Sequence, residues 1–311
     1  MQMRFLTILL VLSFDAAQAE PAEVKITWNG DYAHNSSKHW SKDNPYDSGF
    51  SKNFKNGTPQ EFGDVQKDGE LNAFIYSPKE AKGPVPFVIV MHGCDGMSTT
   101  EKEWTARVAN AINKEGFGAL VLDSYTTRYV DNSCGLSDLH WGRRRSDDAY
   151  SALDYLIEKK LTKFNEVYIM GYSNGGTTAL VSMTTQESDH PHRFAAAFAI
   201  APGCSPSLQH SALYTGPVLI FMGDKDDANN PEWCRELTKK KRSVPVQMIE
   251  YQGANHGFVL DVPSHLGDHG WALTYNPVAE KDMMQTIISA IKAKKIKSGI
   301  EVRTAQGAAL K

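Results

Sequence analysis

The stretch of sequence that decides the fold is Val167-Tyr168-Ile169-Met170-Gly171-Tyr172-Ser173-Asn174-Gly175-Gly176. A run of β-branched and other apolar residues ends in Gly-x-Ser-x-Gly, and small residues compatible with a helix follow. This pattern is typical of a nucleophile elbow, in which a strand turns sharply into a helix and holds a serine at the turn. The glycines on either side of Ser173 allow a tight, strained turn. Because Gly-x-Ser-x-Gly also occurs by chance, the interpretation depends on the rest of the chain.

Apolar runs alternate with amphipathic ones on both sides of this stretch. We expect strands at Val24–Trp28, Leu71–Ser77, Pro86–Met91, Gly118–Leu122, Val167–Gly171, Ala195–Ala199, Val218–Met222 and Val246–Tyr251. We expect helices at Thr100–Glu115, Arg143–Lys160, Gly175–Thr185, Pro231–Lys241 and Val278–Lys295. The alternation predicts an α/β fold with a mostly parallel central sheet and helices on both faces.

The N-terminus has the three parts of a signal peptide. Arg4 supplies positive charge, Phe5–Phe14 is a short apolar core, and Ala17-Gln18-Ala19 offers a cleavage site before Glu20. The apolar core is too short to span a bilayer comfortably, although a buried strand or helix is the alternative interpretation. We therefore expect a soluble periplasmic or secreted protein, cleaved after Ala19.

The remaining chain is expected to contain a single folded domain. Residues 20–68 are polar and form a predicted N-terminal arm, residues 69–295 form the predicted α/β domain, and residues 296–311 form a C-terminal tail, expected to be frayed. No Pro-, Gly- or Ser-rich linker interrupts the alternation of strands and helices.

The composition is that of an ordinary globular protein and points to no particular class of macromolecular partner. The 311 residues are 41% hydrophobic and 22% charged, and the net charge of −3 gives no reason to expect nucleic acid or an anionic membrane as partner. The four cysteines fit an oxidising compartment, and they allow three pairings among which spacing alone does not choose. Their spacing is not that of a zinc site.

Reactive residues follow four of the predicted strands, where the carboxyl ends of parallel strands meet. His92-Gly93-Cys94 follows the strand ending at Met91, and small Gly93 lets the backbone approach a developing oxyanion. The N–H of Cys94 is one candidate donor, and the N–H of Asn174 after the nucleophile is the second. His92 itself is expected to brace the loop.

An acid and a histidine complete the order expected of an α/β-hydrolase. Gly223–Asp227 contains three carboxylates, of which Asp226 is best placed to orient a histidine, whereas Asp224 and Asp227 are expected to be solvated or to cap a helix. His256 lies between small residues after the next strand and can act as general base toward Ser173. His265 and His269 are second choices, more plausible at the rim.

The chain resembles the dienelactone-hydrolase-like branch of the α/β-hydrolases, in its secreted serine form. The resemblance rests on Pro86–Gly96, Asp123-Ser124-Tyr125 with Arg128 and Cys134, Arg145–Leu156, the Ser173 elbow, Ala201–Cys204, Gly223–Asp227 with Cys234, and His256–Phe258. It implies that Ser173, Asp226 and His256 are catalytic, with ester hydrolysis through an acyl-enzyme and with no metal or organic cofactor.

Two departures from the family pattern stand out. The name-giving dienelactone hydrolases use cysteine where this chain has Ser173, which argues against dienelactone as substrate. Relatives often have Arg-Gly where this chain has Arg128-Tyr129. Arg128 is therefore either a ligand for a substrate carboxylate, as arginines are in the family pocket, or a surface residue. The run Arg143-Arg144-Arg145 is expected to open a helix beside a solvated face, and no function is predicted for it.

Placed on the family pattern, the cysteines suggest two local disulfides. A Cys94–Cys134 bridge would tie two loops at the rim, and a Cys204–Cys234 bridge would hold the loop of the acid.

The sequence thus predicts a serine esterase acting on a small-molecule ester. A peptidase or amidase on the same fold, or a non-catalytic binding protein that kept it, are the alternatives.

Overall fold

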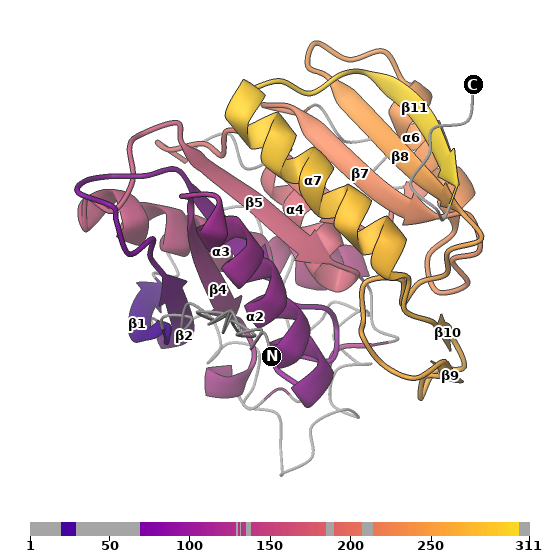
Figure 1. Ribbon diagram of the computed structural model, residues 1–311, viewed down its shortest axis with the longest axis horizontal. Helices are drawn as coiled ribbons and strands as arrows, with labels where there is room; N and C mark the ends of the chain where they lie inside the picture. The colour runs from indigo at the N-terminus through magenta and orange to yellow at the C-terminus, as the bar shows by residue number, and fades with distance from the viewer. Residues whose placement is uncertain are drawn as a thin grey trace, which may run out of the picture.

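The computed structural model describes residues 20–28, 69–128, 130, 132–134, 138–184, 190–206 and 214–304. Its centre is a nine-stranded sheet in the order β1-β2-β4-β3-β5-β6-β7-β8-β11. The strands are β1 (Ala22–Trp28), β2 (Gly69–Tyr76), β3 (Phe87–Met91), β4 (Gly118–Asp123), β5 (Val167–Tyr172), β6 (Ala197–Ile200), β7 (Val218–Gly223), β8 (Val246–Gln252) and β11 (Gly299–Thr304). A short hairpin of β9 (His265–Leu266) and β10 (Ala272–Leu273) lies apart from this sheet (Figure 1).

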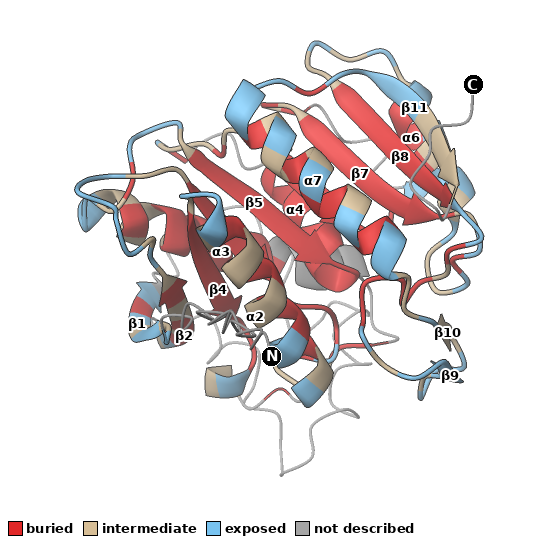
Figure 2. Ribbon diagram, in the orientation of Figure 1, coloured by how far each residue is buried: buried red, intermediate tan, exposed pale blue. Residues whose placement is uncertain are grey.

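Burial explains the sequence of each strand. Every residue of β3, β4, β5 and β7 is buried, as expected for parallel strands covered on both faces, and these strands read as continuous apolar runs. Strand β2 pairs antiparallel with both β1 and β4, and its buried residues alternate with partly exposed ones. Figure 2 shows the central strands buried along their length.

Helices cover both faces of the sheet. They are α2 (Thr99–Lys114), α3 (Asp138–Glu158), α4 (Asn174–Ser182), α6 (Pro231–Lys239) and α7 (Pro277–Ala293). In Figure 1, α2 and α7 lie in front of the sheet and α4 and α6 behind it, and α3 packs against α4. The α/β architecture expected from the sequence is confirmed, including the strand predicted at Val24–Trp28.

The expectation of a frayed C-terminal tail is wrong from Gly299 to Thr304. This segment forms β11, which pairs in parallel with β8 at the edge of the sheet. The pairing satisfies backbone groups that an uncovered β8 would expose, and the apolar residues Ile300 and Val302 were too few to signal it. The sheet therefore uses strands from both predicted flanks. The signal peptide predicted at residues 1–19 lies outside the described residues.

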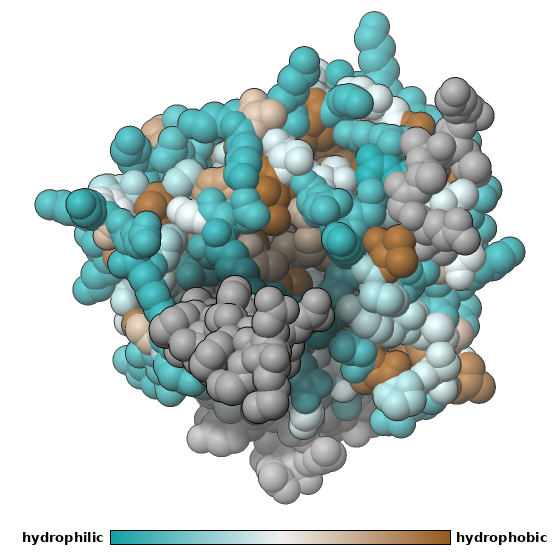
Figure 3. Space-filling view, viewed as in Figure 1, coloured by the Kyte–Doolittle hydropathy of each residue, from teal (hydrophilic) through white to brown (hydrophobic). Residues whose placement is uncertain are grey.

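The described part of the chain contains no helix with the length and hydrophobicity needed to cross a bilayer. The face of the molecule in Figure 3 is mostly hydrophilic, with hydrophobic residues in small separate groups.

Candidate active site

Ser173 lies at a sharp turn between β5 and α4. Its backbone has φ 54° and ψ −118°, a conformation that residues other than glycine rarely adopt. Its N–H donates to the carbonyl of Ile200 at 2.8 Å. A Cβ atom on Gly171 would lie 2.2 Å from the carbonyl oxygen of Gly175, and one on Gly176 would lie 2.7 Å from that of Ile200. The glycines are therefore required by contact between main chains, as the elbow interpretation expects.

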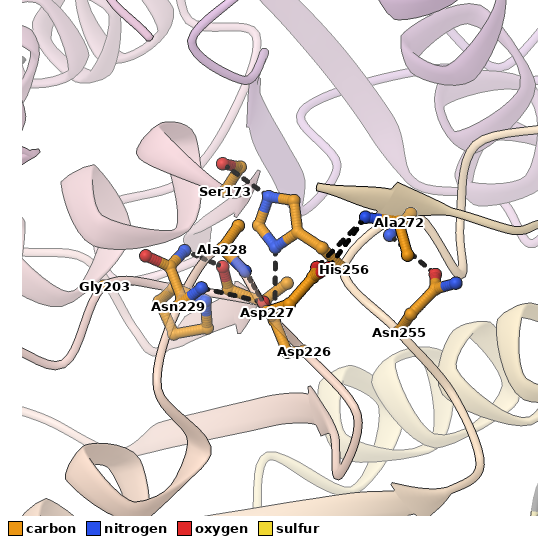
Figure 4. Close-up of polar contacts among 12 residues, drawn as sticks. Ser173, Gly203, Asp226, Asp227, Ala228, Asn229, Asn255, His256 and Ala272 are labelled. Atoms are coloured by element: carbon orange, nitrogen blue, oxygen red, sulfur yellow. Dashed lines mark hydrogen bonds and ion pairs between the residues drawn. The ribbon is translucent and has the colours of Figure 1, made fainter. Parts of the chain in front are cut away.

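Three buried side chains form a hydrogen-bonded line at this turn (Figure 4). His256 Nε2 lies 3.0 Å from Ser173 Oγ, and His256 Nδ1 lies 2.9 Å from Asp226 Oδ2. A carboxylate only accepts hydrogen bonds, so Nδ1 carries the proton and Nε2 accepts from the serine hydroxyl. This arrangement can transfer the hydroxyl proton to the imidazole as the serine attacks an electrophile.

The backbone orients Asp226 toward the histidine. Its second oxygen, Oδ1, accepts hydrogen bonds from the N–H groups of Ala228 at 3.0 Å and Asn229 at 2.8 Å. The Asn229 side chain in turn donates to the carbonyl of Ala201 at 2.8 Å, which ties this loop to the end of β6. Both carboxylate oxygens of Asp226 are thus engaged, and the one facing His256 is fixed.

The two neighbouring carboxylates have separate tasks. Asp224 accepts a hydrogen bond from Gly253 N–H at 2.6 Å, and Asp227 accepts one from Ala272 N–H at 2.9 Å. Neither caps α6, whose N-cap is Asn230. Asp227 instead attaches the β9–β10 hairpin to the loop that carries Asp226, as Figure 4 shows.

The predicted oxyanion donors, Cys94 and Asn174, lie on segments that are packed together. Asn174 is the first residue of α4, where backbone N–H groups point out of the helix N-terminus. Cys94 lies in the loop after β3. A Cβ atom on Gly175 would lie 2.5 Å from the carbonyl oxygen of His92, so this loop and the first turn of α4 touch through their main chains.

His92 braces this loop, as expected. Its Nε2 accepts from Ser124 N–H at 3.3 Å, so Nδ1 carries the proton and donates to the Gly93 carbonyl at 2.8 Å. Burial and the neighbouring Arg145 lower the pKa of His92 to about 3, which keeps the ring neutral in this role.

The structure contains two disulfides, Cys94–Cys134 and Cys204–Cys234, which are the pairs suggested by the family pattern. The first joins the loop after β3 to the segment after β4. The second ties the end of β6 to α6, so the chain between them carries β7 and Asp226. Disulfides of this kind agree with an extracellular or periplasmic protein.

Three arginines are placed differently from what the sequence suggests. Arg128 is neither a surface residue nor a lining residue of the cavity at Ser173; its guanidinium forms a bidentate ion pair with buried Asp148, at 2.6 and 2.7 Å. Arg144 and Arg145, expected at the start of a helix beside a solvated face, lie within α3 and are both buried, at 4% and 0% exposure. A run of basic residues does not reveal what packs across the helix.

A cavity of about 160 Å³ opens at Ser173 and His256. Its other lining residues include the Cys94–Cys134 bridge, Asp95 of the loop after β3, Glu101 of α2 and Tyr172 of β5. The segment after β8 contributes Leu260, His265, Asp268, His269, Trp271 and Leu273. His265 and His269 are thus rim residues. The ring of His269 stacks on that of Trp271, with 4.9 Å between centroids.

Glu101 is a residue of this cavity that sequence reasoning missed. It is buried in the first turn of α2, and burial raises its pKa to about 8 although the Gly93 N–H hydrogen bond opposes this. A Cβ atom on Gly93 would lie 2.2 Å from Glu101 Oε1. Gly93 therefore makes room for this carboxyl group, in addition to allowing the close approach predicted for the loop.

Two clusters within the described residues have the composition of a metal site. One contains Cys94 and Cys134, whose sulfurs are joined and cannot act as thiolate ligands. In the other, Asp154 is hydrogen-bonded to His190 and to His192 at 3.1 and 2.6 Å.

Comparison with known proteins gives consistent matches. The model of the dienelactone hydrolase family matches residues 71–294. A Bradyrhizobium protein described as a probable 2-oxo-3-(5-oxofuran-2-ylidene)propanoate lactonase is 26% identical over 217 residues, which cover 63% of this chain and 82% of that protein.

Two solved structures show the same fold. A dienelactone hydrolase-like promiscuous phosphotriesterase from metagenomic libraries has a TM-score of 0.54 at 18% identity, covering 88% of this chain and 99% of its own. Esterase 2 of Thermogutta terrifontis, phosphorylated by paraoxon, has a TM-score of 0.54 at 17% identity, covering 72% of this chain and 90% of its own.

Proposed function

The chain belongs to the dienelactone hydrolase family, and from that premise we propose that it hydrolyses carboxylic esters, lactones included, through an acyl-enzyme on Ser173. The observation that carries the proposal is the hydrogen-bonded line from Ser173 Oγ to His256 and Asp226, with distances of 3.0 and 2.9 Å, of which Ser173 and His256 line a cavity. The relative described as a lactonase supports cyclic esters as substrates.

The chemistry follows from the positions of the three side chains. Ser173 Oγ attacks the acyl carbon while His256 Nε2 takes its proton, and Asp226 stabilises the imidazolium that forms. The N–H groups of Cys94 and Asn174 donate to the oxyanion of the tetrahedral intermediate. The intermediate collapses as His256 returns the proton to the leaving alkoxide oxygen, and water then releases the acid by the same route.

The experiment is turnover of a matched set of a short-chain ester, a lactone and an amide by the wild type and by Ser173→Ala. We expect the wild type to hydrolyse the ester and the lactone faster than the amide, and Ser173→Ala to lose activity while its circular dichroism spectrum is unchanged. Undiminished ester hydrolysis by the variant would exclude Ser173 as nucleophile. Preference for the amide would indicate a peptidase or amidase, and turnover of none of the three would favour a binding protein.

We also propose that the protein works in the periplasm or outside the cell, with residues 1–19 removed. The support is the signal-peptide pattern together with the two disulfides. N-terminal sequencing of protein from the native host should begin at Glu20, and a mature chain that begins at Met1 would contradict the proposal.

A further inference from the structure

Arg145 lies fully buried in α3 and bonds two segments of the active site. Its Nη1 donates to the side-chain oxygen of Asn174 at 2.7 Å, and its Nη2 donates to the main-chain carbonyl of His92 at 2.6 Å. Its exposure is 0%. One guanidinium therefore connects the first residue of α4 with the loop that follows β3.

These two acceptors belong to the segments that carry the proposed oxyanion donors. Asn174 itself supplies one donor through its backbone N–H, and His92 precedes Cys94, the other, by two positions. The guanidinium is planar and presents its N–H groups in a rigid fork. It can therefore fix the distance between the two segments, which a flexible ammonium group would not do.

Three other peptide groups of the loop are also hydrogen-bonded. Gly93 N–H donates to Glu101, the Gly93 carbonyl accepts from His92 Nδ1, and the Cys94 carbonyl accepts from Ser133 N–H at 2.8 Å. These bonds fix the loop against α2 and the segment after β4. Arg145 differs from them because it joins the loop to the helix of the nucleophile.

The location of the charge is informative as well. Burying a charged group is costly, and even a buried ion pair can often be replaced by apolar residues without loss of stability. The acceptors of Arg145 named above are neutral, and its guanidinium also lies 5.1 Å from the centre of the Tyr125 ring. Its charge acts on the site, because it lowers the pKa of both His92 and Glu101. A positive charge behind the oxyanion donors favours the anionic intermediate.

Building on the hydrolase function proposed above, we propose that Arg145 is a positioning residue of this enzyme. It holds the Cys94 and Asn174 N–H groups at the spacing that one oxyanion oxygen requires, and it adds positive charge behind them. Its effect is then on the transition state rather than on substrate binding.

The test compares kcat and KM for a neutral short-chain ester among Arg145→Lys, Arg145→Met and Asn174→Ala. The last variant removes the side-chain acceptor and keeps the backbone N–H. We expect kcat to fall about 10- to 100-fold in Arg145→Met, somewhat less than the loss of one oxyanion donor, and less again in the other two. KM should change less than about threefold, because an interaction made only in the transition state affects kcat.

A double-mutant cycle gives a second readout, which is useful if Arg145→Met folds poorly. Because Arg145→Lys and Asn174→Ala remove the same bond, their effects on kcat should be less than additive. Arg144→Met serves as control, since Arg144 is also buried in the same helix; its kcat per folded molecule should equal that of the wild type.

The outcomes separate this inference from the proposed function. Loss of activity in Ser173→Ala together with wild-type kcat in Arg145→Lys, Arg145→Met and Asn174→Ala would overturn the role of Arg145 alone. A loss of activity that is fully accounted for by a smaller fraction of folded protein, or a change in KM alone, would also overturn it. Full activity in Ser173→Ala would instead overturn the proposed function.

Discussion

Gly175 packs directly against the main chain of Met91: a Cβ atom on Gly175 would lie 2.4 Å from the Met91 carbonyl oxygen. The contact joins the first turn of α4, which follows the nucleophile, to the end of β3, from which the loop of Cys94 leaves. Because both partners are backbone, no side chain can rotate to relieve a collision.

We therefore predict that Gly175→Ala separates α4 from β3. The free energy of unfolding should fall by about 1 to 3 kcal/mol, as is usual for overpacking, and kcat should fall at least about 10-fold because the site is displaced. Urea unfolding and ester turnover measure these effects. Gly83→Ala is the matched control, since a Cβ there meets nothing within 4 Å. Wild-type values for Gly175→Ala would contradict the interpretation of the elbow.

A second prediction concerns the buried pair of Arg128 and Asp148. Burial alone would raise the pKa of Asp148, but Arg128 and Arg144 more than offset this and lower it. Arg128→Met leaves a buried carboxylate without its bidentate partner, so the free energy of unfolding should fall by about 3 to 5 kcal/mol. Arg128→Met combined with Asp148→Leu should recover part of the loss. Equal stability of Arg128→Met and wild type in thermal unfolding would show that the pair is not needed.

A third prediction concerns pH and Glu101. Its carboxyl group has a pKa of about 8 in the folded protein, mainly because it is buried, against about 4.3 in an unfolded chain. The folded state therefore favours the protonated form. The stabilisation is complete below the unfolded pKa and is lost as pH rises through about 8, at up to about 1.4 kcal/mol per pH unit.

Glu101→Gln removes the ionisation and keeps the size of the side chain. Between pH 5 and pH 8 (a window of about 3 units set by the two pKa values), the wild type should lose stability relative to this variant in urea unfolding. If the free energies of unfolding of the two proteins change in parallel with pH, Glu101 does not titrate in this range.

The sequence predicted those parts of the site that depend on local pattern and chain order. The glycines around Ser173 require a tight turn wherever they occur, and the order of Ser173, Asp226 and His256 matches the strand ends of one sheet. Arg145 and Glu101 could not be recognised in this way. Each reaches the loop of Gly93 from a different helix, and a contact across elements leaves no periodic signal in the sequence.

Arg128, in contrast, was given a role that its place in the structure does not support. The family pattern suggested a substrate ligand, but the choice between a substrate carboxylate and Asp148 depends on which partner the fold places within reach. Strand β11 was not predicted for a related reason. An edge strand pairs with a neighbour along only one side, and it can form with few apolar residues.

The measurement that tests the central claim most directly is the intact mass of the folded, unreduced protein after exposure to a fluorophosphonate, followed by peptide mapping. An activated serine should give a single adduct on Ser173. The His256→Ala variant should give none in the same time, because the Ser173 hydroxyl has then lost its general base. No adduct on folded wild-type protein, or an adduct on another residue, would contradict the assignment of Ser173, His256 and Asp226 as a catalytic triad.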